Sequence, residues 1–233
     1  SVRTLPAEAL RPGHRIAGLA YDDHRYRVET ASGEAVRGDA VILATPAFAT
    51  ARIARLFDPR LADRCAAIPY ASAATVSMAF ERAAVAHPLN GSGFVVPRVE
   101  GTGILAGSWL SSKWPHRAPE GKVLLRTFLG GARDPHALEL NDTEMVLRSL
   151  AALRPLLGLV GDPLFTRVYR WDNANAQHEV GHLARVAAIE QALEPHAGLF
   201  VTGSGYRGVG IPDCVADARS TARRAAAWLN GRR

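Results

Sequence analysis

The 233-residue sequence is poor in cysteine and lysine and contains no long apolar run. Its two cysteines, Cys65 and Cys214, are too few and too far apart for a disulfide framework or a four-ligand zinc site, so no metal centre is expected. No run of about 18 apolar residues occurs, which excludes an ordinary membrane-spanning helix. The sequence that begins at Ser1 shows no signal peptide. We expect the sequence to be a fragment of a longer chain, and we expect that chain to be cytoplasmic.

Composition places the chain among globular proteins. It is 48% hydrophobic and 21% charged, with a mean hydropathy of −0.02, which excludes an intrinsically disordered protein. The length corresponds to about one and a half average domains, so one large domain or two small ones would fit.

The positive charge is almost entirely arginine. The net charge is +6, and Lys113 and Lys122 are the only lysines. Arginine binds carboxylates and phosphates through a bidentate fork, so an acidic small molecule or a membrane surface would suit this charge, although a compositional bias toward arginine would also explain it. Because the arginines are scattered and are not interleaved with aromatic residues, we expect no binding to nucleic acid.

The first 64 residues have the pattern of an α/β unit. We predict strands over residues 16–19, 26–30 and 35–44, separated by polar turns typical of a meander. The last of these ends in GDAVILATPA, a continuous apolar run that favours a strand buried on both faces. A helix is predicted over residues 48–57.

The middle of the chain predicts an antiparallel sheet with helices. Strands are expected at residues 74–80, 93–96, 104–110, 123–129 and 164–171, and helices at residues 141–157 and 179–193. Either Asn141 or Asp142 would cap the first of these helices.

The tail resembles the beginning, with a strand over residues 199–202 and a helix over residues 215–229. We therefore predict a discontinuous domain, residues 1–64 and 198–233, with a second domain at residues 65–197 inserted into it.

Gly203, Gly205 and Gly208 form a G-x-G-x-x-G pattern between the last strand and the last helix. This pattern alone would indicate a dinucleotide-binding turn. That turn requires a second parallel strand about 20 residues later, and the sequence ends before one could form. An alternative is that residues 208–211 present backbone N–H groups at a helix N-terminus, which favours negatively polarised groups such as flavin carbonyls. A plain tight turn before a helix would fit equally well.

Longer blocks of the sequence resemble one family. GLFVTGSGYRGVGIPDCVADA resembles the carboxyl-terminal signature of FAD-dependent protoporphyrinogen/coproporphyrinogen oxidases, and GFVVPRVEG, SWLSSKWPHRAPEGKVLLRTFLGG and EVGHLARVAAIE resemble other blocks in the family's order. GDAVILATPA is similar to a strand shared by the wider amine-oxidase-like flavoproteins. The resemblance implies a mixed α+β and α/β fold: the carboxyl-terminal half of a two-domain flavoprotein, with an antiparallel-sheet substrate domain inserted into part of an FAD-binding domain.

The resemblance also implies site residues. For the cofactor FAD they are Ile16, Trp171, Val209, Gly210 and Ile211. For a tetrapyrrole substrate they are Val95, Trp109 and Phe128, while core packing is the alternative role for each of these three.

The implied reaction is the oxidation of a porphyrinogen to a porphyrin in haem biosynthesis, with oxygen reoxidising the flavin. With its many arginines and the motif GVGIPDC at residues 208–214, the chain resembles the bacterial branch that uses coproporphyrinogen III more than the membrane-bound branch. Further partners would be the missing amino-terminal half and, as open alternatives, a second copy in a homodimer and a peripheral membrane contact. The catalytic residues are unknown.

Individual side chains leave other questions open. Arg98, Lys113, Arg117 and Arg126 are candidates for substrate carboxylates, and also for ordinary surface charges. We expect His182 to be a hydrogen-bonded structural residue rather than an acid or base. Two alternative functions are another amine-oxidase-like flavoenzyme and a catalytically empty fragment, and we expect the isolated chain to bind no FAD.

Overall fold

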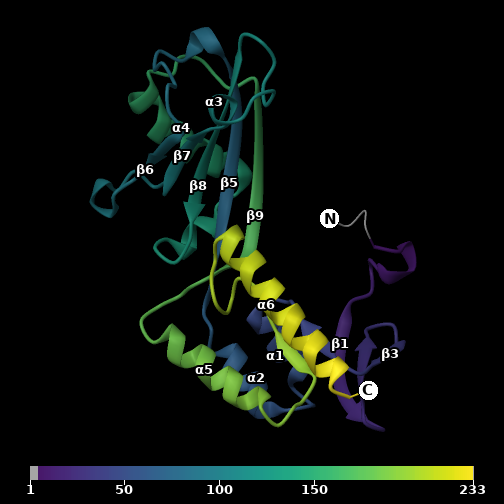
Figure 1. Ribbon diagram of the computed structural model, residues 1–233. Coiled ribbons are helices and arrows are strands. Elements are labelled where there is room, and N and C mark those ends of the chain that lie inside the picture. The colour runs from purple at the N-terminus through teal and green to yellow at the C-terminus, as the bar shows by residue number, and fades with distance from the viewer. Residues whose placement is uncertain (1–4, 233) are drawn as a thin grey trace. The chain divides into compact units, whose positions relative to one another are not determined.

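A computed structural model describes residues 5–232 and divides them into two units (Figure 1). The first unit runs to Pro69 and resumes at Ala176, and the second is Tyr70–Asn175. The boundaries differ from the expected residues 65 and 197. In particular, helix α5 (His182–Leu193), which we expected in the inserted domain, belongs to the first unit.

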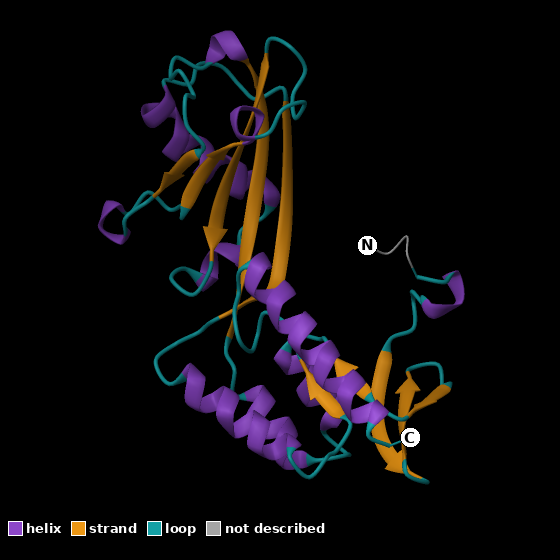
Figure 2. Ribbon diagram, in the orientation of Figure 1, coloured by secondary structure: helices purple, strands orange, loops and turns teal. Residues whose placement is uncertain are grey.

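The first unit contains two small sheets (Figure 2). One is an antiparallel meander in the order β1-β2-β3, as predicted, and the other pairs β10 with β4 in parallel. The elements of this unit are β1 (Ile16–Asp22), β2 (Arg25–Thr30), β3 (Ala35–Gly38), β4 (Val41–Leu43), α1 (Ala47–Ala54), α2 (Pro59–Ala66), α5, β10 (Leu199–Val201) and α6 (Ile211–Asn230).

Two predictions for this unit were wrong. Residues 35–44 do not form one strand, because the chain leaves the meander after Gly38 and begins a separate strand at Val41. That strand is not buried on both faces, since Ile42 is 41% exposed in a sheet of only two strands. Helix α6 also begins four residues earlier than the predicted residue 215.

The second unit is built on a five-stranded sheet in the order β6-β7-β8-β5-β9. Its elements are β5 (Tyr70–Glu81), β6 (Gly93–Val95), β7 (Ala106–Trp109), α3 (Leu110–Lys113), β8 (Lys122–Gly130), α4 (Asp142–Leu157) and β9 (Phe165–Ala176). Pairs β6–β7, β7–β8 and β5–β8 are antiparallel, which confirms the predicted sheet type.

Helix α4 covers one face of this sheet. Asn141 caps the helix: its side chain accepts the Glu144 N–H at 3.0 Å, and the Glu144 carboxylate accepts the Asn141 N–H at 2.8 Å. Side chains such as Phe80, Leu125 and Met145 are almost fully buried between the sheet and α4. Alternation along each strand therefore divides the sheet into a core face and an opposite face, here called the outer face. No helix within residues 5–232 has the length and apolar character needed to cross a bilayer.

Candidate functional site

The loop between β10 and α6, residues 202–210, is here called the glycine loop. Gly203 has a φ of +128°, a backbone conformation that side chains with a Cβ rarely adopt. At Gly208 and Gly210, an added Cβ would lie 2.5 and 2.8 Å from atoms of the Asp213 side chain. The backbone at Gly203 and the close approach of Asp213 Cβ to Gly208 therefore favour glycine at these two positions, whereas at Gly210 the Asp213 carboxylate could move aside.

The glycine loop ends at a well-formed helix N-terminus. Gly210 is the N-cap of α6, Ile211 is its first residue, and Pro212 lies in the first turn. The helix therefore begins before the predicted residue 215, and its start agrees with the alternative that residues 208–211 lead into a helix N-terminus. The Val209 and Ile211 side chains are 60% and 81% exposed. No backbone or side-chain acceptor within residues 5–232 takes the N–H groups of Val209, Gly210 or Ile211. These donors remain available to a ligand.

A buried tyrosine anchors the glycine loop. Tyr206 is 0% exposed, and its hydroxyl donates to Thr50 Oγ1 at 2.9 Å. Thr50 is in turn 2.8 Å from Thr45 Oγ1. Tyr206 also bonds the Cys65 thiol; burial raises the pKa of that thiol to about 12, although this bond works in the opposite direction. Sequence reasoning missed this network, because Tyr206 and Thr50 are 156 residues apart and no motif links them.

Two stacked histidines hold the backbone of the same loop. The ring nitrogens His182 Nε2 and His178 Nε2 lie 2.7 and 3.1 Å from the carbonyl oxygens of Tyr206 and Ser204, and the two rings stack at 3.8 Å. Since a carbonyl can only accept, both Nε2 atoms carry the proton. The expectation that His182 is a hydrogen-bonded structural residue is confirmed.

A buried arginine fixes the middle of the loop. Arg207 donates to the Glu190 carboxylate and, at 3.1 Å, to Asp217 Oδ1. Partial burial lowers the pKa of Arg207, but the hydrogen bond with Glu190 and the charges of Asp217 and Glu190 outweigh that effect, so the net shift is upward. Thr202 donates to the other Asp217 oxygen at 2.5 Å. These hydrogen bonds hold the glycine loop in one conformation.

Ile16 lies at the start of β1 and is half-buried, and it pairs with Thr30 just before an irregularity in the register. Its backbone is therefore in the first unit, as is the glycine loop. Its predicted contact with adenine stays a prediction.

The outer face of the five-stranded sheet carries a transverse row of side chains, here called the outer row. The register pairs Val95 with Ala106, Ala106 with Phe128, and Phe128 with Thr75, so these four share one face. Trp171 on β9 completes the row, because its Nε1 donates to Thr75 Oγ1 at 3.3 Å. Val95 is 79% and Trp171 52% exposed, so the row offers accessible apolar surface.

The prediction that Val95, Trp109 and Phe128 form one wall needs correction. Trp109 pairs with the core residue Leu125, and Leu125 is an odd number of positions from Phe128 on β8. Alternation therefore puts Trp109 on the core face, where it is 7% exposed and lies 4.8 Å from the His87 ring. The outer row brings Val95 and Phe128 together, whereas Trp109 lines a pocket with Val95 and His87 to which Phe128 does not contribute.

Trp171 belongs to the second unit, whereas Val209, Gly210 and Ile211 belong to the first. Its predicted place beside the flavin stays a prediction. Of the candidate cations, Arg126 lies two residues before Phe128 on β8 and so shares the outer face, 3.4 Å from Ser77 Oγ.

The donors at the end of the glycine loop fit a flavin. A ring system with carbonyl oxygens would find unpaired N–H groups, exposed apolar side chains and the positive end of the helix dipole at one place. The second unit offers the broad apolar strip that a flat ligand needs.

Comparison with known proteins identifies the family of the chain. The model of the family described as flavin containing amine oxidoreductase matches residues 3–226. Coproporphyrinogen III oxidase of Bacillus subtilis (strain 168) is 32% identical over 93% of this chain, which spans 46% of that protein. The chloroplastic protoporphyrinogen oxidase of Nicotiana tabacum is 28% identical over 82% of this chain and 36% of its own length. The chain thus spans less than half the length of these curated relatives.

A solved structure shares the fold. The crystal structure assigned as a protoporphyrinogen oxidase from Exiguobacterium sp. 255-15 superposes with a TM-score of 0.78 at 29% identity, covering 92% of this chain and 46% of the other. The predicted fold class, a portion of an amine-oxidase-like flavoprotein with mixed helices and sheets, is therefore confirmed.

Proposed function

Because this chain belongs to the flavin containing amine oxidoreductase family, we propose that it forms part of an FAD-dependent enzyme that oxidises coproporphyrinogen III in haem biosynthesis. The observation that carries the proposal is the rigid glycine loop, which ends in free N–H donors at the start of α6. Oxygen as electron acceptor and a cytoplasmic location, with any membrane contact peripheral, are parts of the same proposal.

The cofactor would accept a hydride from a carbon of the porphyrinogen, and the protein would supply position and polarity. The N–H groups of Val209, Gly210 and Ile211 would hold a ring carbonyl and stabilise the negative charge that develops there on reduction. Tyr206 and Arg207 would keep those donors in place, because both are fixed by buried hydrogen bonds.

The outer row would bind the substrate. Phe128 and Val95 provide apolar surface for a flat macrocycle, and Arg126 provides a positive charge beside it for a carboxylate. The chain is 32% identical to a coproporphyrinogen III oxidase and 28% identical to a protoporphyrinogen oxidase, which supports coproporphyrinogen III as the substrate.

The substrate choice is tested by porphyrin fluorescence. The protein that carries this chain, loaded with FAD, is given coproporphyrinogen III or protoporphyrinogen IX at equal concentrations. We expect the first to be oxidised faster, and Arg126→Gln to raise its KM more than it lowers kcat. The reverse order of rates would refute the preference.

The role of the helix N-terminus is tested by removing one donor. Ile211→Pro deletes a single N–H at a helix position where proline is well tolerated, whereas Ile211→Ala keeps the N–H and removes only the side chain. A hydrogen bond to a neutral carbonyl contributes about 0.5–1.5 kcal/mol, so we expect Ile211→Pro to weaken binding of oxidised FAD roughly 2- to 10-fold and Ile211→Ala to have little effect. Equal FAD affinity in the two variants, measured by flavin fluorescence quenching, would refute the role.

A further inference from the structure

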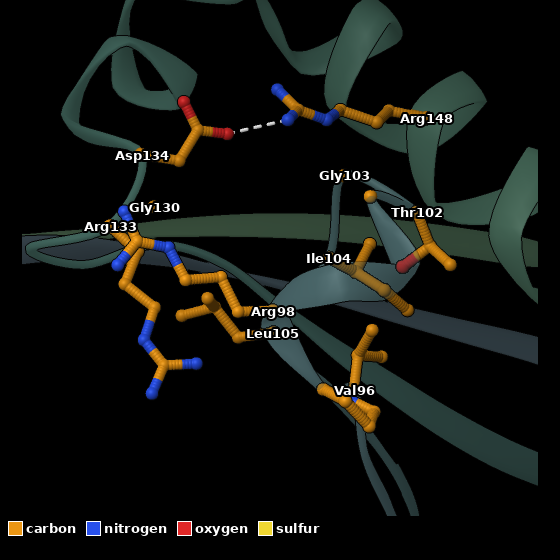
Figure 3. Close-up of a pocket in the computed structure, with 12 residues that line it drawn as sticks. Val96, Arg98, Thr102, Gly103, Ile104, Leu105, Gly130, Arg133, Asp134 and Arg148 are labelled. Atoms are coloured by element: carbon orange, nitrogen blue, oxygen red, sulfur yellow. Dashed lines mark hydrogen bonds and ion pairs between the residues drawn. The ribbon is translucent and has the colours of Figure 1, made fainter.

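A polar cavity lies in the second unit, away from the outer row. Figure 3 shows it between the loop that joins β6 to β7, the chain just after β8, and helix α4. Its volume is about 280 Å³, and core residues Val96 and Ile104 form its apolar side. Because these two pack with the core under α4, the cavity is not on the face that carries Phe128.

One arginine of the cavity is held rigidly. Arg148 on α4 donates to Asp134 Oδ2, as the dashed line in Figure 3 marks. Its guanidinium lies against the backbone of Gly103, where an added Cβ would be 2.4 Å from Arg148 Nε. Gly103 also has a φ of +79°, so glycine serves both the turn and the arginine.

Two more arginines line the cavity without a partner. Within residues 5–232, neither Arg98 nor Arg133 makes an ion pair or side-chain hydrogen bond, and both are exposed. Figure 3 shows their side chains on one side of the cavity and the Asp134–Arg148 pair on another. Three arginines against one aspartate give the lining two uncompensated positive charges.

A buried hydroxyl lies in the wall of the cavity. Thr102 Oγ1 has almost no solvent contact and bonds to no atom of the described chain, yet Thr102 lines the cavity. A buried hydroxyl without a partner is destabilising, so it is usually met by a ligand or a water molecule.

We propose that this cavity binds a small molecule through a carboxylate or phosphate group. Arg98 and Arg133 would bind the oxyanion, and Val96 and Ile104 would contact a short apolar body. The proposal is independent of the proposed flavin and porphyrinogen roles, because those use residues 209–211, Phe128 and Arg126. Arg98, an initial candidate for the substrate carboxylates, lines this cavity.

Calorimetric titration of the purified chain tests this, with inorganic phosphate and malonate as separate probes and the ionic strength held constant with sodium chloride. We expect saturable binding of at least one probe at one site per chain. Phosphate binding would identify a phosphoryl ligand, and malonate binding would identify a carboxylate ligand.

Substitutions in the cavity should change the affinity for the probe in opposite directions. Arg98→Gln and Arg133→Gln should each weaken binding about 10- to 100-fold, the range of a charge-assisted hydrogen bond. Asp134→Asn should tighten it several-fold, because the Arg148 guanidinium then loses its competing carboxylate. The matched control is Arg64→Gln on α2, an exposed arginine outside the cavity, which should leave the affinity within twofold.

Three results would overturn the proposal. The first is that neither probe gives saturable heat up to about 50 mM. The second is that Arg64→Gln loses as much affinity for the probe as Arg98→Gln and Arg133→Gln do. The third is that Asp134→Asn binds the probe more weakly than the parent chain. The substituted arginines are exposed and unpartnered, so circular dichroism should show these variants folded as the parent chain is.

Discussion

The two units secure their functional segments in different ways. In the second unit, an almost wholly apolar core between the sheet and α4 fixes the strands that carry the outer row. In the first unit, the glycine loop is fixed mainly by polar contacts of Tyr206, His182 and Arg207. Apolar packing has little directional preference and sets the position of whole strands, whereas hydrogen bonds are directional and can set the position of a single peptide group.

The largest effect is expected in the apolar core. Phe80 is 0% exposed on β5, so Phe80→Ala should reduce the free energy of unfolding by about 3–5 kcal/mol, through lost burial and the cavity that remains. Val99 is 90% exposed, and Val99→Ala should change that free energy by less than about 0.5 kcal/mol. Urea unfolding of both variants measures the difference. A loss below about 1 kcal/mol for Phe80→Ala would mean that apolar packing does not dominate this unit.

One polar pair inside that core sharpens the comparison. Thr127 Oγ1 lies 2.7 Å from Ser149 Oγ, and Ser149 also donates to the Met145 carbonyl. Ser149→Ala leaves the Thr127 hydroxyl buried without a partner and should cost about 1–3 kcal/mol. Thr127→Val leaves Ser149 bonded to Met145 and should cost about 0.5–1.5 kcal/mol. Equal costs in urea unfolding would contradict the argument from unpartnered groups.

The anchoring tyrosine provides the corresponding test in the first unit. Tyr206→Phe removes the hydrogen bonds of the hydroxyl with Thr50 and with the Cys65 thiol but leaves Thr50 bonded to Thr45, so we expect a loss of about 1–2 kcal/mol in unfolding free energy. A looser loop should also expose Cys65, whose thiol is now buried, to iodoacetamide. Tyr21→Phe, at a 46% exposed position, is the control and should alter neither quantity. An unchanged alkylation rate at Cys65 in Tyr206→Phe would argue against the anchoring role.

Local patterns predicted much of this fold. Alternation along residues 74–80 and 123–129 identified the central strands, and Asn141 marked the start of α4. Helix α2 was missed although Asp58 and Pro59 are typical N-cap and first-turn residues, because we interpreted this pair as the end of the preceding helix.

Only those features of the site that depend on residues adjacent in the sequence could be predicted. The turn from Gly208 into Pro212 follows from adjacent residues, and a helix N-terminus there was one of the alternatives that the sequence offered, although the helix itself was predicted to begin at residue 215. The face occupied by Trp109 depends on its pairing with Leu125, and the bond between Tyr206 and Thr50 joins distant segments. Neither can be derived from the order of the residues nearby, since both depend on tertiary register.

The smallest effect concerns the charge at the start of α2. Asp58 caps the helix through the N–H groups of Arg60 and Leu61 and accepts a 2.6 Å hydrogen bond from His196 Nε2. Burial raises the pKa of the Asp58 carboxyl, but the bonds from His196 and the two N–H groups outweigh burial and lower it below 3.8. The folded state therefore gains stability from this carboxylate above about pH 4 and loses it as the pH falls through the lowered value.

Asn preserves the cap acceptor but carries no charge, so Asp58→Asn isolates the contribution of that carboxylate. Above pH 4, the variant should be less stable than the parent by less than about 1 kcal/mol, and the difference should shrink toward pH 3. Urea unfolding at half-unit pH steps measures it. A gap that stays constant or widens on acidification would mean that the cap acts through geometry alone. In that case the first unit, like the second, would owe little of its stability to charge.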